Sequence, residues 1–137
     1  MKVFIDTGAF IALFVFSEKY HKQISNKYSE YRKQRAQLFT SYYILDELYT
    51  RLIYDFGKAS TQKAIELLNK SIEKEELRVL DIDEVIFKKA QGVLIKFSEH
   101  KISLTDATSY VLFKDYSLDE VFTLDDDFKK IRISTSF

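Results

Sequence analysis

Short apolar runs recur along the chain and are typical of buried strands. These runs, rich in β-branched and aromatic residues, are Val3 to Ile5, Leu38 to Thr40, Leu77 to Leu80 and Val121 to Thr123. The runs near residues 3, 38 and 121 lack the alternation of a half-solvated strand, so we expect them to be covered on both faces. A last short strand is expected over Ile131 to Ile133.

Helical patterns separate these runs. We expect helices over residues 9–16, 18–37, 42–56, from residue 60 or 61 to 75, 84–98 and 104–116, with one or two helical turns over 125–130. Ser41, Asp83, Ser103 and either Ser60 or Thr61 are predicted N-caps, and Gly57 is predicted to stop a helix. Short strands that alternate with helices predict an α/β layered domain with a mostly parallel sheet.

The composition limits the chemistry that the chain can perform. Its 137 residues, without linker or repeat, are assigned to one domain, 1–137, and 46% hydrophobic residues exclude a disordered body. The absence of cysteine excludes disulfides, thiolate nucleophiles and iron–sulfur clusters. The two histidines, His21 and His100, leave little room for a histidine-based metal site. Acid chemistry therefore falls to carboxylates.

Charge and the amino-terminal segment bear on partners and location. The chain has 21 basic and 21 acidic residues, which argues against tight, indiscriminate binding of nucleic acid. The apolar run Ala9 to Phe16 resembles a secretory signal, but Asp6 interrupts the apolar stretch and no small-residue cleavage site follows Ser17. The run is also too short to cross a bilayer. We therefore expect a cytoplasmic protein with no membrane segment.

Two acidic positions follow predicted strands. Asp6 ends the first strand, and Asp125 comes just after the strand that ends at Thr123, with Asp126 and Asp127 beside it. Ligands of open parallel sheets bind at the carboxyl ends of strands, where both positions would meet. The alternative is structural: Asp6 can be a helix N-cap, and Thr123 with Asp126 can form a capping box, the interpretation that we prefer for Asp126.

Glu47 and Asp106 are candidates of the same kind within or at the start of helices. Glu47 can instead pair with Arg51 one turn later, and Asp106 can form a capping box with Ser103. Taken together with Asp6 and Asp125, they suit a hard cation such as Mg²⁺ or Mn²⁺, which binds several oxygen ligands.

Four motifs in this order resemble a PIN domain of the VapC-like kind. They are Val3-Phe4-Ile5-Asp6-Thr7, Ser41-x-x-x-Leu45-x-Glu47-Leu48, Leu104-Thr105-Asp106-Ala107 and Phe122-Thr123-Leu124-Asp125-Asp126-Asp127-Phe128. The resemblance covers essentially the whole chain. It implies a PIN-like three-layer α/β fold with a short-stranded, mostly parallel central sheet flanked by helices.

The resemblance also implies a function. The implied function is that of a Mg²⁺- or Mn²⁺-dependent endoribonuclease, which is often the toxin of a pair with a small antitoxin protein. The resemblance also implies a homodimer. The catalytic acids that it implies are Asp6, Glu47, Asp106 and Asp125. The same four acids would hold the metal, with Asp127 as an auxiliary ligand and the Thr123 hydroxyl as a support behind the ligands.

A basic stretch is a candidate surface for RNA. Between Glu18 and Arg35 the basic residues exceed the acidic ones by four, and Tyr20, Tyr28 and Tyr31 are interleaved with them, as in surfaces that track a single strand. The basic residues are Lys19, Lys22, Lys27, Arg32, Lys33 and Arg35. The alternative, which we prefer, is a solvated helix whose tyrosines pack on the core.

Other functions compete with the nuclease. An aspartyl-phosphate phosphatase or receiver-like domain would use Asp6 as the phosphoacceptor, although Asp6-Thr7-Gly8 lacks the second acid of phosphatases that resemble haloacid dehalogenases. A PIN-like module without activity could bind RNA or protein. No Gly-rich phosphate loop is present, since the only glycines are Gly8, Gly57 and Gly92.

Overall fold

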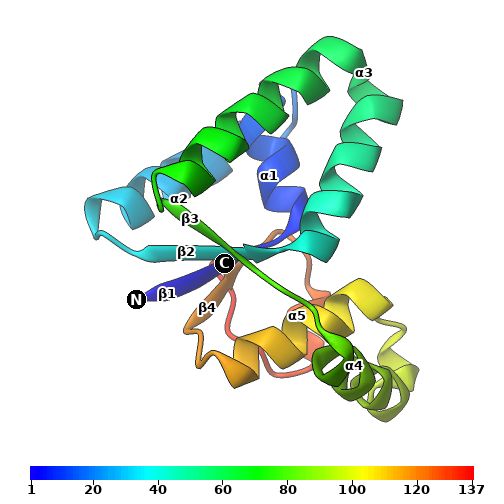
Figure 1. The fold of residues 1–137 in the computed structure, drawn as a ribbon. Helices are drawn as coiled ribbons and strands as arrows, with labels where there is room; N and C mark the ends of the chain where they lie inside the picture. The colour runs from blue at the N-terminus through cyan, green and yellow to red at the C-terminus, as the bar shows by residue number, and fades with distance from the viewer.

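A four-stranded, all-parallel sheet organises residues 1–137 in the computed structural model (Figure 1). Its strands are β1 (Lys2–Ile5), β2 (Gln37–Ser41), β3 (Leu77–Leu80) and β4 (Glu120–Phe122), in the spatial order β3-β2-β1-β4. Each neighbouring pair is parallel. The expected α/β fold with a short-stranded parallel sheet is confirmed. The apolar runs without alternation, near residues 3, 38 and 121, form its two central strands, β1 and β2, and the edge strand β4.

Helices cover both faces of the sheet and complete the three layers. In Figure 1, α1 and the two arms of α3 lie on one side of the sheet, and α4 and α5 lie on the other. The helices are α1 (Thr7–Phe14), α2 (His21–Lys33), α3 (Tyr42–Glu73), α4 (Glu84–Lys96), α5 (Leu104–Asp115) and α6 (Asp127–Lys130), with a short 3₁₀ turn over Ser98–His100.

Three predicted caps are confirmed by hydrogen bonds. The side chain of Ser41 accepts a bond from the backbone N–H of the residue three positions on, and Asp83 and Ser103 do the same for α4 and α5. Each bond satisfies a backbone donor that the first turn of a helix leaves free. These caps therefore set where α3, α4 and α5 begin.

The helix α3 bends sharply at Gly57. This residue has φ +86° and ψ −179°, a conformation that glycine adopts without the clash a Cβ would cause. The second arm starts directly after the bend, and the Thr61 hydroxyl donates a 2.8 Å bond back to the Gly57 carbonyl from inside that arm. The helix break predicted at Gly57 and the helix predicted after it are therefore present, but the predicted N-cap is wrong: Ser60 and Thr61 lie inside the second arm.

The segment after β4 also differs from expectation. Ile131 and Ile133 are buried in the core, but Ile131 to Ile133 form no strand, and only Thr135 makes a single bridge to Val121. Burial of the two isoleucines explains the apolar pattern without sheet pairing. The helix expected over residues 18–37 is also shorter, because residue 37 already begins β2.

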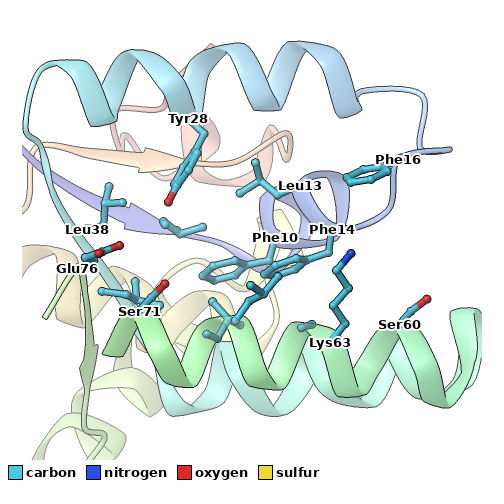
Figure 2. A pocket seen from close by; sticks show the side chains of 15 residues that line it. Phe10, Leu13, Phe14, Phe16, Tyr28, Leu38, Ser60, Lys63, Ser71 and Glu76 are labelled. Carbon is cyan, nitrogen blue, oxygen red and sulfur yellow. The ribbon is translucent and has the colours of Figure 1, made fainter. Parts of the chain in front are cut away.

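An apolar groove of about 540 Å³ lies between α1, α2 and the second arm of α3. Figure 2 shows Phe10, Leu13 and Phe14 of α1 between Tyr28 of α2 and Lys63 of α3. Eleven of its fifteen lining residues are hydrophobic. A hollow of this composition is typical of a surface that binds a ligand or a protein partner.

None of the helices combines the length and the hydropathy that crossing a membrane requires.

Candidate metal and nuclease site

Four carboxylates come together at the carboxyl edge of the sheet. Asp6 follows β1, Asp125 follows β4, Glu47 lies in the first arm of α3, and Asp106 lies in the first turn of α5. The parallel register pairs Ile5 with Phe122, so β1 and β4 end level with each other and deliver Asp6 and Asp125 to one edge.

These carboxylates line one pocket of about 450 Å³. Leu124 is the single hydrophobic residue among its ten lining residues. The ten residues are Asp6, Thr7, Gly8, Glu47, Arg51, Ser103, Asp106, Thr123, Leu124 and Asp125. The pocket therefore offers oxygen ligands almost exclusively, and neither histidine of the chain lies in it.

Asp6 is the most buried of the four acids. Burial raises the pKa of its carboxyl to about 7, a hydrogen bond from Thr123 opposes this shift, and the nearby Asp106 charge adds to it. Asp6 occupies the N-cap position of α1, but its side chain makes no capping hydrogen bond. The carboxylate instead points to the hydroxyl of Thr123, which donates a 2.9 Å bond to its Oδ2.

Asp106 has a structural role and a place in the acid cluster at once. Its backbone N–H bonds to the Ser103 hydroxyl at 3.0 Å, and its Oδ2 accepts from the Ser103 N–H at 3.2 Å, so the expected capping box is present. One oxygen each of Asp106, Asp125 and Asp127 nevertheless lies within 4.8 Å of the other two. Burial raises the pKa of Asp106, and the charges of Asp125 and Asp127 raise it further.

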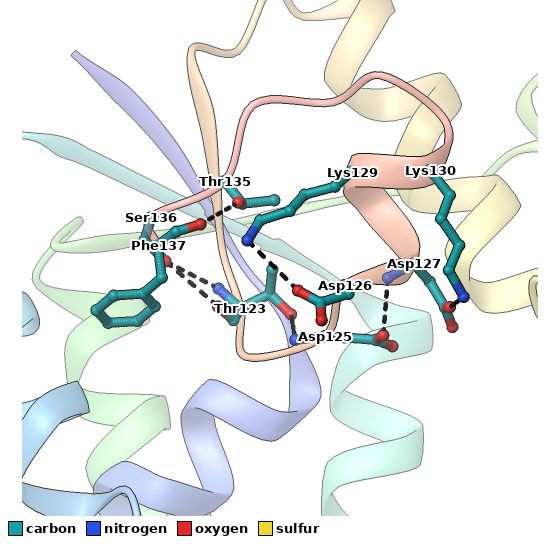
Figure 3. A network of polar contacts seen from close by, with 9 residues as sticks. All are labelled: Thr123, Asp125, Asp126, Asp127, Lys129, Lys130, Thr135, Ser136 and Phe137. Atoms are coloured by element: carbon teal, nitrogen blue, oxygen red, sulfur yellow. Dashed lines mark hydrogen bonds and ion pairs between the residues drawn. The ribbon is translucent and has the colours of Figure 1, made fainter.

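The three consecutive aspartates point in different directions (Figure 3). The N–H of Asp125 donates to the Thr123 hydroxyl at 2.9 Å, and the N–H of Asp127 donates to Asp125 Oδ1 at 2.9 Å. Asp126 faces solvent, 3.4 Å from Lys129 Nζ, and makes no capping bond. The capping box predicted for Thr123 and Asp126 is therefore wrong, because the Thr123 hydroxyl is engaged by Asp6 and Asp125.

Two cations border the acids. Arg51 lies in the pocket with its Nη1 3.7 Å from Glu47 Oε1, the ion pair expected from their spacing. Lys130 Nζ lies 3.0 Å from Asp127 Oδ1. Lys130 is not among the residues predicted from the sequence, although its spacing of three residues from Asp127 on a short helix was a usable signal.

The basic stretch is divided by the structure. The pocket beside the acids includes Tyr20, at the start of α2. At the other end of α2, Arg32 and Arg35 line a separate hollow, which includes Gln37 at the amino end of β2. A helix of this length separates its ends by about 20 Å. The six basic residues therefore do not form one surface beside the acids.

Two of the three tyrosines of this stretch pack against the hydrophobic core. Tyr31 is buried, donates its hydroxyl to Glu120 and packs edge-on against Phe122, so it cannot stack on a base. Tyr28 is half-buried in the apolar groove. The alternative of a solvated helix with tyrosines packed inward is thus correct for Tyr28 and Tyr31, whereas Tyr20 is exposed.

Known proteins with a similar sequence pattern or a similar structure have the fold described above. A family model described as the PIN domain matches residues 3–133. Similar solved structures include VapC20 of Mycobacterium tuberculosis, described as a sarcin-ricin loop cleaving toxin, with a TM-score of 0.80, 20% identity and coverage of 96% of this chain and 95% of that one. No curated protein sequence gives a match.

Two further solved structures are similar in fold. VapBC2 from Rickettsia felis, bound to a DNA fragment from its promoter, has a TM-score of 0.72 at 16% identity and covers 99% of this chain and 98% of that one. FitAcB from Neisseria gonorrhoeae has a TM-score of 0.71 at 17% identity, and the match covers 97% of this chain and 95% of that one. The resemblance expected from the four motifs is confirmed at the level of the fold.

Proposed function

Because the chain belongs to the PIN-domain family, we propose that it is a Mg²⁺- or Mn²⁺-dependent endoribonuclease and the toxin of a toxin–antitoxin pair. The observation that carries the proposal is the convergence of Asp6, Glu47, Asp106 and Asp125 on one polar pocket. A protein does not gather like charges from four elements for stability, since each close pair is repulsive unless a cation compensates it.

The residues present fit a hard divalent cation. Carboxylates are the ligands that Mg²⁺ and Mn²⁺ prefer, and the pocket contains no sulfur or imidazole ligand. The buried Thr7 hydroxyl, also in the pocket lining, has no hydrogen-bond partner and is a further oxygen free to act there. The ligands would be Asp6, Glu47, Asp106, Asp125 and Asp127.

The chain's own residues prepare this pocket for a phosphodiester. A divalent cation, when bound, neutralises charge on the phosphate and activates the attacking water. The Thr123 hydroxyl orients the Asp6 carboxylate and is itself fixed by the Asp125 N–H. Arg51, at the pocket wall, can form paired hydrogen bonds to phosphate oxygens.

The partner in this proposal is a small antitoxin protein that contacts two surfaces. A basic side chain of the antitoxin would enter the acid pocket, because a guanidinium pairs with carboxylates that otherwise hold metal. An apolar segment would lie in the groove of Figure 2. Helix α1 connects both places, since Thr7 and Gly8 line the acid pocket and Phe10 and Phe14 line the groove. A homodimer belongs to the same proposal.

A cleavage assay tests the activity. Purified protein is incubated with structured and unstructured RNA in Mn²⁺ or in EDTA, beside an Asp106→Asn variant purified in the same way. Cleavage only by the unmodified protein and only with Mn²⁺ is expected. Equal cleavage in EDTA, or equal cleavage by the variant, would show contamination or another mechanism.

Two further measurements, of a phosphorylated enzyme and of RNA binding on a native gel, separate the rival functions. An aspartyl-phosphate enzyme would form an acid-stable, hydroxylamine-sensitive phosphate on Asp6 from a phosphoryl donor and leave RNA intact. A binding module without activity would shift RNA on a native gel at every metal concentration and cut none of it.

A further inference from the structure

A second, smaller hollow adjoins the acid pocket. It has a volume of about 210 Å³ and shares Thr123, Leu124 and Asp125 with the acid pocket. Its lining residues come from the start of α2, from the segment after β4 and from the last residues of the chain. They are Tyr20, Gln23, Thr123, Leu124, Asp125, Asp126, Lys129, Thr135 and Phe137.

We infer that this hollow, the Tyr20 subsite, binds one unpaired nucleobase of the RNA next to the phosphate that is cut. The inference rests on the proposed nuclease function and adds to it the residues that would hold the base beside the cut. Because the hollow and the acid pocket share a wall from Thr123 to Asp125, a nucleotide in one places its phosphate at the other.

Exposed aromatic rings give the subsite its stacking surfaces. Tyr20 is 43% exposed and Phe137 42% exposed, although most aromatic side chains of this protein pack on the core. Figure 3 shows the Phe137 ring beside Thr123. Proteins that bind single-stranded nucleic acid stack bases on such rings, because every base has an aromatic face.

Polar groups around these rings can bond to the edge and the backbone of a nucleotide. The exposed Gln23 amide makes no hydrogen bond within the protein, so its donor and acceptor are both available to a base edge. Lys129 is held only by an exposed pair with Asp126 at 3.4 Å, which a phosphate can displace. Lys19 adds a second cation, 5.3 Å from the centre of the Tyr20 ring.

The size of the hollow favours a single ring over a larger ligand. Pockets that enclose whole drug-sized molecules have volumes of about 300–1,000 Å³, more than this hollow provides. The mix of aromatic rings, an amide, one lysine and two aspartates also differs from the apolar groove of Figure 2, which suits a protein segment.

Substitutions at Tyr20 and Gln23 test the subsite. The KM and the cut sites of a randomised single-stranded RNA pool are measured in Mn²⁺ for the unmodified protein, Tyr20→Ala, Tyr20→Phe and Gln23→Ala. We expect Tyr20→Ala to raise KM by about tenfold, the loss of one stacked base, and Tyr20→Phe to restore it. Gln23→Ala should weaken the base preference at one fixed position beside the cut. Matched controls are Tyr54→Ala, at a residue 82% exposed on α3, and Gln62→Ala on the same helix, both without effect.

The results distinguish this inference from the proposed function. Cleavage with the same KM and cut sites in Tyr20→Ala and Gln23→Ala would overturn the subsite and leave the nuclease intact. If no RNA is cut, the nuclease proposal fails, and anisotropy of a labelled single-stranded RNA then decides. Weaker RNA binding by Tyr20→Ala, but not by the control Tyr54→Ala, supports the subsite. Equal RNA binding by Tyr20→Ala and the unmodified protein overturns it. Variants that lose only the affinity for a protein partner would also overturn it.

Discussion

Thr123 and Asp6 lie 117 positions apart in sequence and are joined by a buried hydrogen bond of 2.9 Å. The bond joins the residues that directly follow β4 and β1, the two strands that deliver acids to the pocket. Because the same hydroxyl accepts the Asp125 N–H, one threonine holds two of the four acids in place.

Removing this hydroxyl should weaken metal binding. In Thr123→Val, the Asp6 carboxylate loses the bond that favours its ionised form, and we expect Mn²⁺ affinity to fall roughly tenfold or more, as for other groups that orient metal ligands. Thr123→Ser keeps a hydroxyl and should keep most of the affinity. Calorimetric titration with Mn²⁺ measures this, and equal affinity in Thr123→Val would show that the bond is only structural.

Neutralising a pocket acid should separate activity from stability. We expect Asp106→Asn and Glu47→Gln to abolish RNA cleavage, and to leave the melting temperature in EDTA unchanged or higher, because each change removes repulsion within the pocket. The stabilisation on adding Mn²⁺ should shrink, since a ligand of the folded state stabilises in proportion to its affinity.

Glu84→Gln is the control for these variants, because Glu84 is exposed and pairs only with Lys88, outside the pocket. It should cut RNA and gain the full stabilisation from Mn²⁺. Pocket variants that melt earlier in EDTA, keep the whole Mn²⁺ gain and still cut RNA would make these acids structural.

Metal-free stability should depend on pH through Asp6. The pKa of this carboxyl is about 7 in the folded protein against 3.8 for the ordinary group, so its contribution is full below pH 4 and is lost as the pH rises through 7. The free energy of unfolding in EDTA should therefore fall by up to roughly 4 kcal/mol over this range.

Urea unfolding at several pH values measures the effect, with Asp6→Asn as the comparison. The variant should have a shallower slope, but not a flat one, because the pKa of Asp106 is shifted in the same direction. Parallel slopes in the two proteins would exclude Asp6 as the source.

Lys130 should compete with the metal. Its ammonium group pairs with Asp127, one of the acids whose oxygens lie within 4.8 Å of one another. We expect Lys130→Met to raise Mn²⁺ affinity about two- to fivefold, the size of an exposed ion pair. Lys129→Met, which frees only Asp126, is the matched control and should leave Mn²⁺ affinity unchanged.

The two ends of the basic stretch should differ in RNA binding. Lys19 lies beside Tyr20 near the acid pocket, whereas Arg32 pairs with Glu76 and lines the distant hollow with Arg35. The double variant Lys19→Ala with Lys22→Ala should have a shallower slope of log binding constant against log salt concentration, by the amount that about one or two phosphate contacts contribute. Arg32→Ala with Arg35→Ala should leave it unchanged, and a larger effect of this second pair would place the RNA along the whole helix.

Local features of the fold were readable from the sequence because they depend on neighbours in the chain. Ser41, Asp83 and Ser103 cap helices within three residues of themselves, and Glu47 pairs with Arg51 one turn away. At Gly57 the same reasoning fails in part. The glycine predicts the break and a helix after it, but the second arm starts directly after Gly57 and not at the predicted caps Ser60 or Thr61.

Features that depend on contacts between distant parts of the chain were harder to predict from the sequence. Asp6 and Asp125 could be placed at strand ends, but Glu47 and Asp106 have local partners, Arg51 and Ser103, that explain them equally well without the acid pocket. Ile131 and Ile133 have the apolar pattern of a strand, yet core burial alone satisfies it. The Tyr20 subsite combines α2 with residues more than a hundred positions later, which no local pattern indicates.

The pairing of β4 with β1 has a consequence for synthesis on the ribosome. Asp6 leaves the exit tunnel early, but its partner Thr123 and the ligand candidate Asp125 follow more than a hundred residues later. At about 5–20 residues per second, the nascent chain spends seconds with the acid pocket incomplete. An RNA-cutting centre built in this way cannot act on the message or the ribosome that is making it until β4 has emerged and paired.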